Sequence, residues 1–330
     1  MLIKVFIYLS IFYQRVFKGK YYSCLEILQT YFIIDQRYDR VVRDYYEYVS
    51  SLLSKALETM HPLGLVLLDC RGFSWLKIFL PIKNIAFQIE HTLVKPGARN
   101  CEGALPGSIT IIGSSANYLV RLVKASQLAD ANLVIEYSQI NQLNIRKSPG
   151  LAAYASKSFC ISPALYPLLE ESLGVFSHRE HNTVTLFGNP NETRRKKFLD
   201  TLSTLRVKSQ NINNVFDGVE DLYRNTKILI NIRQTDHHDT LEELRVLPAL
   251  RCGVIVISER APLIEKTCYS KYIIWGELDE LPSLVLEVQN NYEHWHKKIF
   301  ENSGFVRRMN RISRRNELVS LRAVEHLKAL

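Results

Sequence analysis

The sequence predicts an α/β protein of two domains, each built around a parallel sheet, with helical segments at the N-terminal and C-terminal ends. Short apolar runs of five to seven residues alternate with polar segments of helical periodicity, which is typical of parallel strands joined by crossover helices. A polar stretch without periodicity, residues 174–183, interrupts the alternation before it restarts. We therefore predict one domain over residues 1–178 and a second over 179–330, a length that allows two cores.

The N-terminal segment is apolar and basic. Its apolar run from Val5 to Tyr13 is too short to cross a membrane, and no small-residue cleavage site follows it. One interpretation is a buried first strand or helix. The alternative is an interfacial segment that turns Arg15, Lys18 and Lys20 toward anionic lipid.

The remaining elements follow from periodicity and from turn residues. Residues 21–60 are predicted to be helical, because apolar side chains recur at helical spacing from Val42 to Ala56 and His61-Pro62 would end the helix. The first domain then has strands at 64–69, 84–90, 108–113 and 131–137, with a helix over 115–129. The second domain has strands at 184–188, within 207–216, at 227–232 and at 254–258, and helices over 192–205, 218–226 and 241–251.

Charge and cysteine spacing restrict the kind of partner and the compartment. Lys and Arg number 42 against 33 Asp and Glu, a net charge of +9, which favours a nucleotide, a phosphosugar, nucleic acid or an acidic membrane as partner. The helical tail carries a basic cluster that is either a solvated face or a surface for membrane or acceptor: Arg307, Arg308, Arg311, Arg314 and Arg315. Nucleic acid is unlikely because no recognition motif accompanies the charge. Six cysteines without C-x-x-C spacing suit a reducing cytoplasm.

One segment, NIRQTDHHDT at 231–240, gathers an arginine, two aspartates and two adjacent histidines. It follows the carboxyl end of a predicted strand, where parallel sheets bind ligands. Thr240 and Glu243 have the spacing of a capping box, and Gly253 stands where the next helix should end. These features predict a ligand-binding and catalytic loop, although residues that only cap the helix remain an alternative.

A metal site is a further alternative for this segment. His238 and Glu242 are four residues apart on the predicted helix. Adjacent histidines rarely ligate one ion together, and the sequence has no H-E-x-x-H motif. We therefore predict no metal and no cofactor.

Polar residues also follow other predicted strands, at the carboxyl-end edges of the two predicted sheets. Glu136 and Ser138 end one strand of the first domain and Glu90 ends another, followed by His91, Lys95 and Arg146 in the loops beyond. Gly188 and Asn189, with Arg194 and Arg195, follow the first strand of the second domain and could meet phosphates. The sequence has no G-x-G-x-x-G, Walker A or G-x-S-x-G motif, which disfavours dinucleotide oxidoreductases, P-loop NTPases and α/β-hydrolases.

Two stretches resemble the nucleotide-sugar-binding domain of the GT-B glycosyltransferases, which have two Rossmann-like domains facing across a cleft. They are VTLFGNPNETRRKKFLDTL at 184–202 and LEELRVLPALRCGVIVISE at 241–259. The sequence departs from that pattern at Pro248, where an acidic residue is usual. Two shorter phrases, IEHTLVKPGAR at 89–99 and DANLVIEYSQINQLNIR at 130–146, are similar to bacterial surface-polysaccharide transferases, and among them to the retaining β-Kdo transferases.

The resemblance implies a metal-independent glycosyltransferase that moves a sugar, for the narrower family Kdo from CMP-Kdo, to a surface glycan or glycolipid. Such an enzyme of polysaccharide or lipopolysaccharide biosynthesis would be cytoplasmic or peripheral on the inner membrane face. Asp236 and Glu136 are the first candidates for an acidic nucleophile or base and Asp239 is the third. His237 and His238 would hold the sugar or the leaving group. The expected donor-binding residues are Gly188, Asn189, Arg194, Arg233, Gln234, Ser258, Glu259 and Arg260. The expected acceptor or sugar contacts are His91, Lys95 and Arg146.

Two other functions fit the same sequence. A nucleotide-sugar epimerase would use a similar two-domain cleft without an acceptor. A non-catalytic protein that binds membrane or nucleic acid through the basic tail would show salt-sensitive binding and no turnover. The Asp236→Asn change separates the transferase from the non-catalytic protein, because a catalytic Asp236 predicts loss of transfer in a folded protein.

Overall fold

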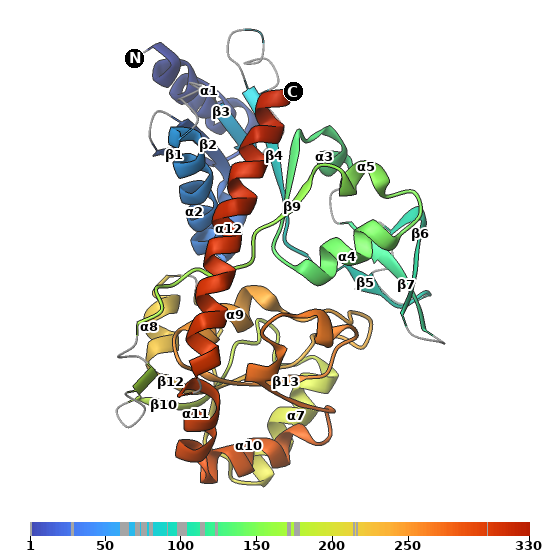
Figure 1. Ribbon diagram of the computed structural model, residues 1–330, viewed down its shortest axis with the longest axis vertical. Coiled ribbons are helices and arrows are strands. Elements are labelled where there is room, and N and C mark those ends of the chain that lie inside the picture. The colour runs from blue at the N-terminus through green and yellow to red at the C-terminus, as the bar shows by residue number, and fades with distance from the viewer. Residues whose placement is uncertain are drawn as a thin grey trace.

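The computed structural model describes residues 2–27, 30–59, 66–69, 73, 78, 82–90, 92–97, 104–112, 116–122, 125–169, 173–174, 179–213, 215, 217–301 and 303–330. Two main sheets lie one beyond the other along the longest axis, and the C-terminal helix runs beside both (Figure 1). The mixed α/β architecture with parallel sheets agrees with the prediction.

The first half of the chain contains α1 (Leu2–Lys18), β1 (Tyr22–Ile27), β2 (Thr30–Asp35), α2 (Gln36–Thr59), β3 (Val66–Asp69), β4 (Ile82–Gln88), β5 (Leu93–Val94), β6 (Ala104–Ile112), β7 (Ala116–Arg121), α3 (Ala125–Asp130), β8 (Leu133–Glu136), α4 (Gln139–Lys147), α5 (Ala152–Ala155) and β9 (Ser158–Cys160). Its main sheet has the order β1-β2-β3-β4-β8-β9 and is parallel except for the β1–β2 pair. Strands β5, β7 and β6 form a separate antiparallel sheet.

The second half contains β10 (His181–Thr185), α7 (Thr193–Thr204), β11 (Ser209–Asn211), α8 (Val219–Arg224), β12 (Thr226–Asn231), α9 (Glu243–Arg251), β13 (Ile255–Glu259), two short 3-10 turns, β14 (Ile273–Gly276), α10 (Leu281–Asn290), α11 (Tyr292–Phe300) and α12 (Ser303–Ala329). Its sheet, β11-β10-β12-β13-β14, is parallel throughout. Helix α9 ends just before Gly253, whose φ of +75° gives the left-handed stop that the sequence predicted.

The N-terminal part of the predicted helix over 21–60 is wrong. Residues 22–27 and 30–35 form the antiparallel strands β1 and β2, and helix α2 occupies only 36–59. The stretch TYFIID (residues 30–35) is rich in β-branched and aromatic side chains, which favour a strand when a partner strand is available. The apolar side chains after Val42 do lie on a helix, but the predicted helix begins too early in the sequence.

The predicted helix over 115–129 is also wrong in its first part. Residues 116–121 form β7, which pairs antiparallel with β6, and among the described residues of this range the helix is limited to Ala125–Asp130. Tyr118, Val120 and Leu122 are buried in alternation, which is the period of a strand. A short apolar run fits both periods, and pairing with β6 decides between them. The strand predicted at 108–113 therefore belongs to the antiparallel sheet rather than to a parallel one.

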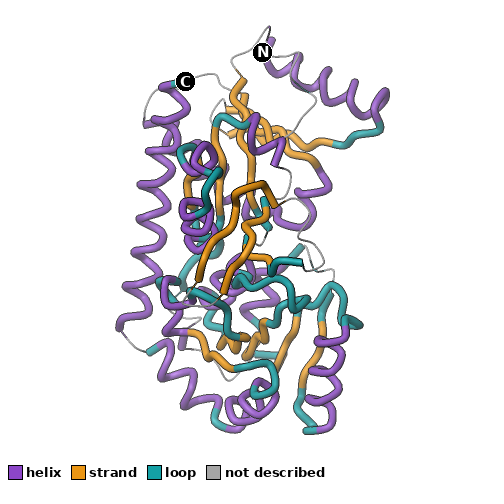
Figure 2. Tube along the Cα trace, turned by 90° about the vertical axis from the view of Figure 1, so that its right-hand side faces the viewer, coloured by secondary structure: helices purple, strands orange, loops and turns teal. Residues whose placement is uncertain are grey.

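Helix α12 returns to the first half and packs against α2, β8 and β9 (Figures 1 and 2). Asn316 makes the specific contacts of this packing. Its side-chain oxygen accepts from the Ser162 N–H at 3.0 Å, and its side-chain nitrogen donates to the Ser162 carbonyl at 2.7 Å and to the Tyr48 hydroxyl at 3.0 Å. Because α12 begins in the second half, these bonds help to set how the two halves sit.

We predict that Asn316→Ala lowers the free energy of unfolding by about 2 kcal/mol, because it leaves buried backbone groups of Ser162 without their partner. Urea unfolding followed by circular dichroism measures the change. Asn310→Ala, an exposed position on the same helix, is the matched control and should be nearly neutral. Equal stability of the two variants would show that Asn316 does not hold α12 in place.

Candidate functional site

A pocket of about 400 Å³ lies between the two halves of the chain. Its lining consists of Glu90 from the first half and, from the second, Gly188, Asn189, Arg195, Asn231, Ile232, Arg233, Gln234, His238, Thr240, Glu242 and Arg245. Most of these residues follow the carboxyl ends of β10 and β12. The chain leaves β10 for β11 on one side and returns to β12 on the other, so the pocket lies at the point where the strand order reverses. Open parallel sheets bind ligands at such a point.

Two arginines give the pocket a positive wall. Arg195 is only 6% exposed; its guanidinium lies 4.5 Å from the centre of the Phe187 ring and donates to the Ile232 carbonyl at 3.3 Å. Burial and, to a smaller extent, the nearby Arg245 guanidinium lower the pKa of Arg195 to about 10. Two guanidinium groups that repel each other in a half-enclosed pocket are stabilised when an anion binds between them.

Two carboxylates also line the pocket. Glu90 enters from the first half, two residues beyond the end of β4, and an Arg121 guanidinium nitrogen lies 3.5 Å from its carboxylate. The Glu90 side chain is 48% exposed, so it can meet a ligand. Glu242 lines the pocket as well, at the N-cap of α9, and its charge partly offsets the lowering of the Arg195 pKa. The pocket lining therefore combines arginines of the second half with one carboxylate from each half.

The loop 233–239 joins the halves by extending the antiparallel sheet of the first half. The Lys95 N–H donates to the His237 carbonyl, and the Asp239 N–H donates to the Leu93 carbonyl, both at 3.2 Å. Val94 and His238 form an antiparallel bridge between these bonds. The loop thus occupies the free edge of β5 as an added strand would.

Asp239 is buried at this junction. Its carboxylate accepts from the Tyr118 hydroxyl at 2.9 Å, lies 3.8 Å from the Lys95 ammonium group and pairs with Arg233. The residue is 3% exposed and does not line the pocket. It therefore holds the two halves together in this structure.

A second ionic cluster centres on Glu259, at the end of β13. Arg194 donates to both Glu259 oxygens at 2.8 Å, and Arg233 pairs with the same carboxylate. Burial alone would raise the pKa of Glu259, but the hydrogen bonds from Arg194 and Arg233 outweigh it and hold the pKa at about 2. Arg194 also binds Asp236 at 2.8 Å, and the Asp236 side chain is 73% exposed. Arg194 is therefore already neutralised by carboxylates.

Glu136 and Glu243 are buried where the halves meet. Glu136 accepts from the Ser138 N–H at 3.0 Å and from the Asn141 side chain at 3.1 Å. Glu243 accepts from the Ser138 hydroxyl and, at 2.7 Å, from the Tyr269 hydroxyl. Burial raises the pKa of Glu136 well above its ordinary value, and raises that of Glu243 to about 7 against the effect of its two hydrogen bonds.

The capping box predicted from Thr240 and Glu243 is wrong. Helix α9 begins at Glu243 itself, and its cap has no side-chain hydrogen bond. The Glu243 carboxylate points instead to Ser138 and Tyr269. A hydroxyl donor from another element competes successfully for the carboxylate that local spacing assigned to the helix start.

The structure brings part of the predicted site together. The pocket lining includes Gly188, Asn189, Arg233, Gln234 and His238. Five other predicted residues take part in hydrogen bonds or ion pairs around the pocket without lining it: Glu136, His237, Asp239, Ser258 and Glu259. The Ser258 hydroxyl, for example, accepts from the Asn231 side chain at 3.0 Å. Asp236, Arg194, Lys95 and Arg260 are outside the lining, and Arg260 lies 3.6 Å from Glu277. Arg146 lines a separate pocket with Arg315 and Arg322, and His91 lies outside the described residues.

Sequence reasoning did not single out Arg245, and it treated Glu242 only as half of a metal pair. Both lie at the start of α9, directly after the loop at the strand edge. The signal that could have found them is helical position, because the first turn of a helix that follows a parallel strand faces the ligand edge of the sheet.

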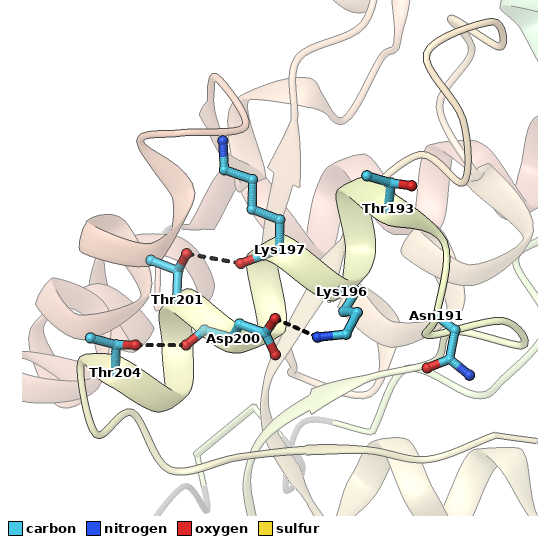
Figure 3. Close-up of a pocket in the computed structure, with 7 residues that line it drawn as sticks. All are labelled: Asn191, Thr193, Lys196, Lys197, Asp200, Thr201 and Thr204. Atoms are coloured by element: carbon cyan, nitrogen blue, oxygen red, sulfur yellow. Dashed lines mark hydrogen bonds and ion pairs between the residues drawn. The ribbon is translucent and has the colours of Figure 1, made fainter.

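A larger pocket, of about 480 Å³, lies along the outer face of α7. Its lining residues come from α7 and the turn before it (Figure 3). Lys196 pairs with Asp200 at 2.7 Å, and the Thr201 and Thr204 hydroxyls donate to helix carbonyls at 2.8 and 3.0 Å. These side chains bind to their own helix, and the described lining residues all come from α7 and the turn before it. We therefore place the site at the pocket between the halves.

The described part of the chain has no group of three or more His, Cys, Asp or Glu arranged to hold a metal ion. Among the described helices, none joins the length and the apolar character that a bilayer-crossing segment requires.

No family model matches the sequence. An uncharacterised protein of Acanthamoeba polyphaga mimivirus, R358, is 30% identical over 112 residues, which are 33% of this chain and 40% of that protein. The structure is similar to that of TarM, with 8% identity and a TM-score of 0.44, over 79% of this chain and 58% of TarM. It is also similar to Arabidopsis thaliana UGT89C1 complexed with UDP-L-rhamnose, with 11% identity and a TM-score of 0.33, over 82% of this chain and 75% of UGT89C1. Both TM-scores are below 0.5.

The raised pKa of Glu243 predicts that stability falls as pH rises. The folded state binds a proton with a pKa of about 7, against an ordinary value of 4.5. This contribution is fully present below the ordinary value and is lost as pH rises through the folded one. It amounts to about 2 kcal/mol between roughly pH 5.5 and 8. Other ionisable groups face Glu243 or lie near it, namely Glu136, Glu242, Cys268 and Tyr269. The test therefore compares the pH dependence of the free energy of unfolding between two variants.

Glu243→Gln should remove this part of the pH dependence. Chemical unfolding at the two pH values gives the free energies, and Glu287→Gln on the exposed face of α10 is the control. A Glu243→Gln protein with the same pH dependence as the Glu287→Gln control would contradict the assignment.

Proposed function

We propose that the protein is a glycosyltransferase that moves a sugar from a nucleotide-sugar donor to a glycan or glycolipid acceptor. One observation carries the proposal: a pocket at the reversal of strand order that is lined by arginines of one half and by a carboxylate from the other. Departure of a nucleotide from a sugar leaves a positively charged, oxocarbenium-like centre and a negatively charged leaving group. The pocket offers opposite charge to each.

The second half would bind the donor. Gly188 and Asn189 present the chain at the end of β10, and Arg195 and Arg245 would contact the donor phosphate. Helix α9 starts beside them, and the N-terminus of a helix favours an anion. In this proposal the guanidinium groups counter the charge of the leaving nucleotide, so the enzyme needs no metal and no cofactor.

The first half would bring the acceptor to Glu90. The bond from the anomeric carbon to the phosphate oxygen breaks, and its electron pair leaves with the nucleotide. In a retaining reaction Glu90 attacks the anomeric carbon, and the acceptor hydroxyl then displaces it and releases its proton. Glu242 and His238 would hold the sugar hydroxyls. Asp236, the first candidate from the sequence, would act indirectly by holding Arg194.

Of the three arginines that line the pocket, Arg233 pairs with Glu259 and Asp239, and Arg195 and Arg245 could together meet a donor that carries two anionic groups. CMP-Kdo is such a donor, because it carries a phosphate and a sugar carboxylate. We therefore propose a CMP-Kdo-like donor and a surface polysaccharide or lipopolysaccharide precursor as acceptor, with the enzyme in the cytoplasm or at the inner membrane face.

A nucleotide that binds the folded protein must raise its melting temperature, by an amount that grows with the logarithm of its concentration. We expect CMP to stabilise the protein more than UDP, GDP or dTDP, with the same shift in EDTA. A thermal-shift panel measures this. A response to UDP or GDP alone would exclude the Kdo donor but keep the transferase. No response in a folded protein, or turnover of donor without acceptor, would contradict the proposed transfer.

Arg245→Gln should weaken nucleotide binding roughly ten- to a hundredfold, since a charge-assisted hydrogen bond to phosphate is worth about 1.5–3 kcal/mol. Arg260→Gln is the matched control, because Arg260 lies outside the pocket and faces Glu277. Isothermal titration with the stabilising nucleotide gives both affinities. Equal loss in the two variants would remove Arg245 from the donor site.

Glu90→Gln should lower the rate of transfer by more than about a hundredfold with little change in donor affinity, because it removes the proposed nucleophile or base. Asp236→Asn should retain more activity, since Asp236 is exposed and acts through Arg194. Initial rates with donor and acceptor test both, and Asp200→Asn on α7 is the control. Full activity of Glu90→Gln with loss in Asp236→Asn would restore Asp236 as the catalytic residue.

A further inference from the structure

Helix α1 is apolar around most of its circumference. One face packs on the first sheet, where Ile3, Ile7 and Ile11 contact a cluster that includes Tyr22 and Ile33. Ile7 is fully buried in this cluster. Helix α1 is therefore docked on the fold by a stripe of isoleucines at steps of four residues.

The opposite face of α1 is just as apolar but is exposed. Leu2, Val5, Leu9, Phe12 and Val16 follow each other at steps of three and four residues and form one stripe along the helix. Their exposed fractions lie between 49% and 75%, and Phe17 is 66% exposed beside them. We call this stripe the outer face of α1. A helix that is apolar all round is normally covered all round, and a contiguous exposed apolar face marks an interaction surface.

Charge identifies the kind of partner. Helix α1 has no acidic residue, and Arg15, Lys18 and Lys20 are exposed at its C-terminal end. Lys4, by contrast, is paired with Glu26 at 2.5 Å. The aromatic side chains Phe6, Tyr8, Phe12, Tyr13 and Phe17 are all exposed on α1. Apolar and aromatic side chains beside basic ones are the composition of a helix that lies in the interface of an anionic bilayer.

The position of α1 suits such contact. It lies at the end of the molecule far from α10 and the second sheet, with its long side open (Figures 1 and 2). The candidate pocket lies between the halves, away from α1. A flat surface could therefore meet the outer face of α1 without closing the pocket.

We propose that α1 binds an anionic lipid surface, lying in the plane of the bilayer with its outer face among the acyl chains and Arg15, Lys18 and Lys20 at the headgroups. Seventeen residues of an amphipathic helix are enough for this arrangement. The inference rests on α1 and not on the proposed transfer, so either can fail alone.

Flotation of the full chain with vesicles tests the proposal. We expect binding to phosphatidylcholine vesicles that contain phosphatidylglycerol, and weak binding to phosphatidylcholine alone. Leu9→Ser with Phe12→Ser should weaken binding to the anionic vesicles more than about tenfold. Arg15→Glu with Lys18→Glu should weaken it at low salt, because the headgroup attraction is screened by salt.

Leu318→Ser is the matched control, because Leu318 is 59% exposed on α12 and is not part of α1. It should bind vesicles as the unchanged chain does. Circular dichroism and the melting temperature of each variant separate loss of binding from loss of folding. Absence of flotation with anionic vesicles, or equal flotation of the Leu9→Ser, Phe12→Ser protein, would overturn the proposal. A dimer in solution that these two changes dissociate, without flotation, would assign the outer face of α1 to a second copy instead.

Discussion

The way the first half meets the second at the pocket depends first on one contact, the docking of loop 233–239 onto the edge of β5. Two backbone hydrogen bonds and the Val94–His238 bridge join the loop to the first half. Asp239 then adds the Tyr118 hydroxyl and the Arg233 guanidinium to the same junction. Because β5 is an edge strand, its unpaired backbone groups would otherwise be solvated. The loop satisfies them and at the same time brings Glu90 opposite the second half.

The ionic groups divide into those that hold the structure and those that a ligand can use. Arg194 and Arg233 share the carboxylates of Glu259, Asp236 and Asp239, so two cations face three anions and the cluster is already neutralised. Arg195 and Arg245 stand apart from these pairs and line the pocket. The burial that lowers the pKa of Arg195 shows a cation held in a poorly solvated place. An anion bound there replaces the interaction with water that the guanidinium group lost on burial.

The unit from β12 through the loop and α9 to β13 could be predicted from the sequence. Buried apolar runs, a polar segment between them and Gly253 determine that unit locally. The β1–β2 hairpin and β7 could not, because short apolar runs fit strand and helix periods equally and only their pairing partners decide. The sequence also does not predict the direction in which each side chain points. Asp236 and Asp239 are three residues apart, yet one is exposed and the other buried against the first half.

The two halves have largely separate apolar cores, and the contacts between them near the pocket are polar. Ser138 is central here: it caps α4, where its hydroxyl accepts from the Asn141 N–H, and it donates to Glu243 at the start of α9. The first turns of two helices, one from each half, thus meet across a single hydroxyl.

This arrangement explains how two buried carboxylates can be tolerated at the junction. Glu136 lies two residues before the cap of α4, and Glu243 is the first residue of α9. The N-terminus of a helix carries partial positive charge, which offsets part of the cost of burying a carboxylate beside it. The raised pKa values of both groups show that the offset is incomplete. The contact that aligns the halves is therefore specific in geometry but modest in strength, as an interface beside a ligand pocket requires if the ligand is to enter and leave.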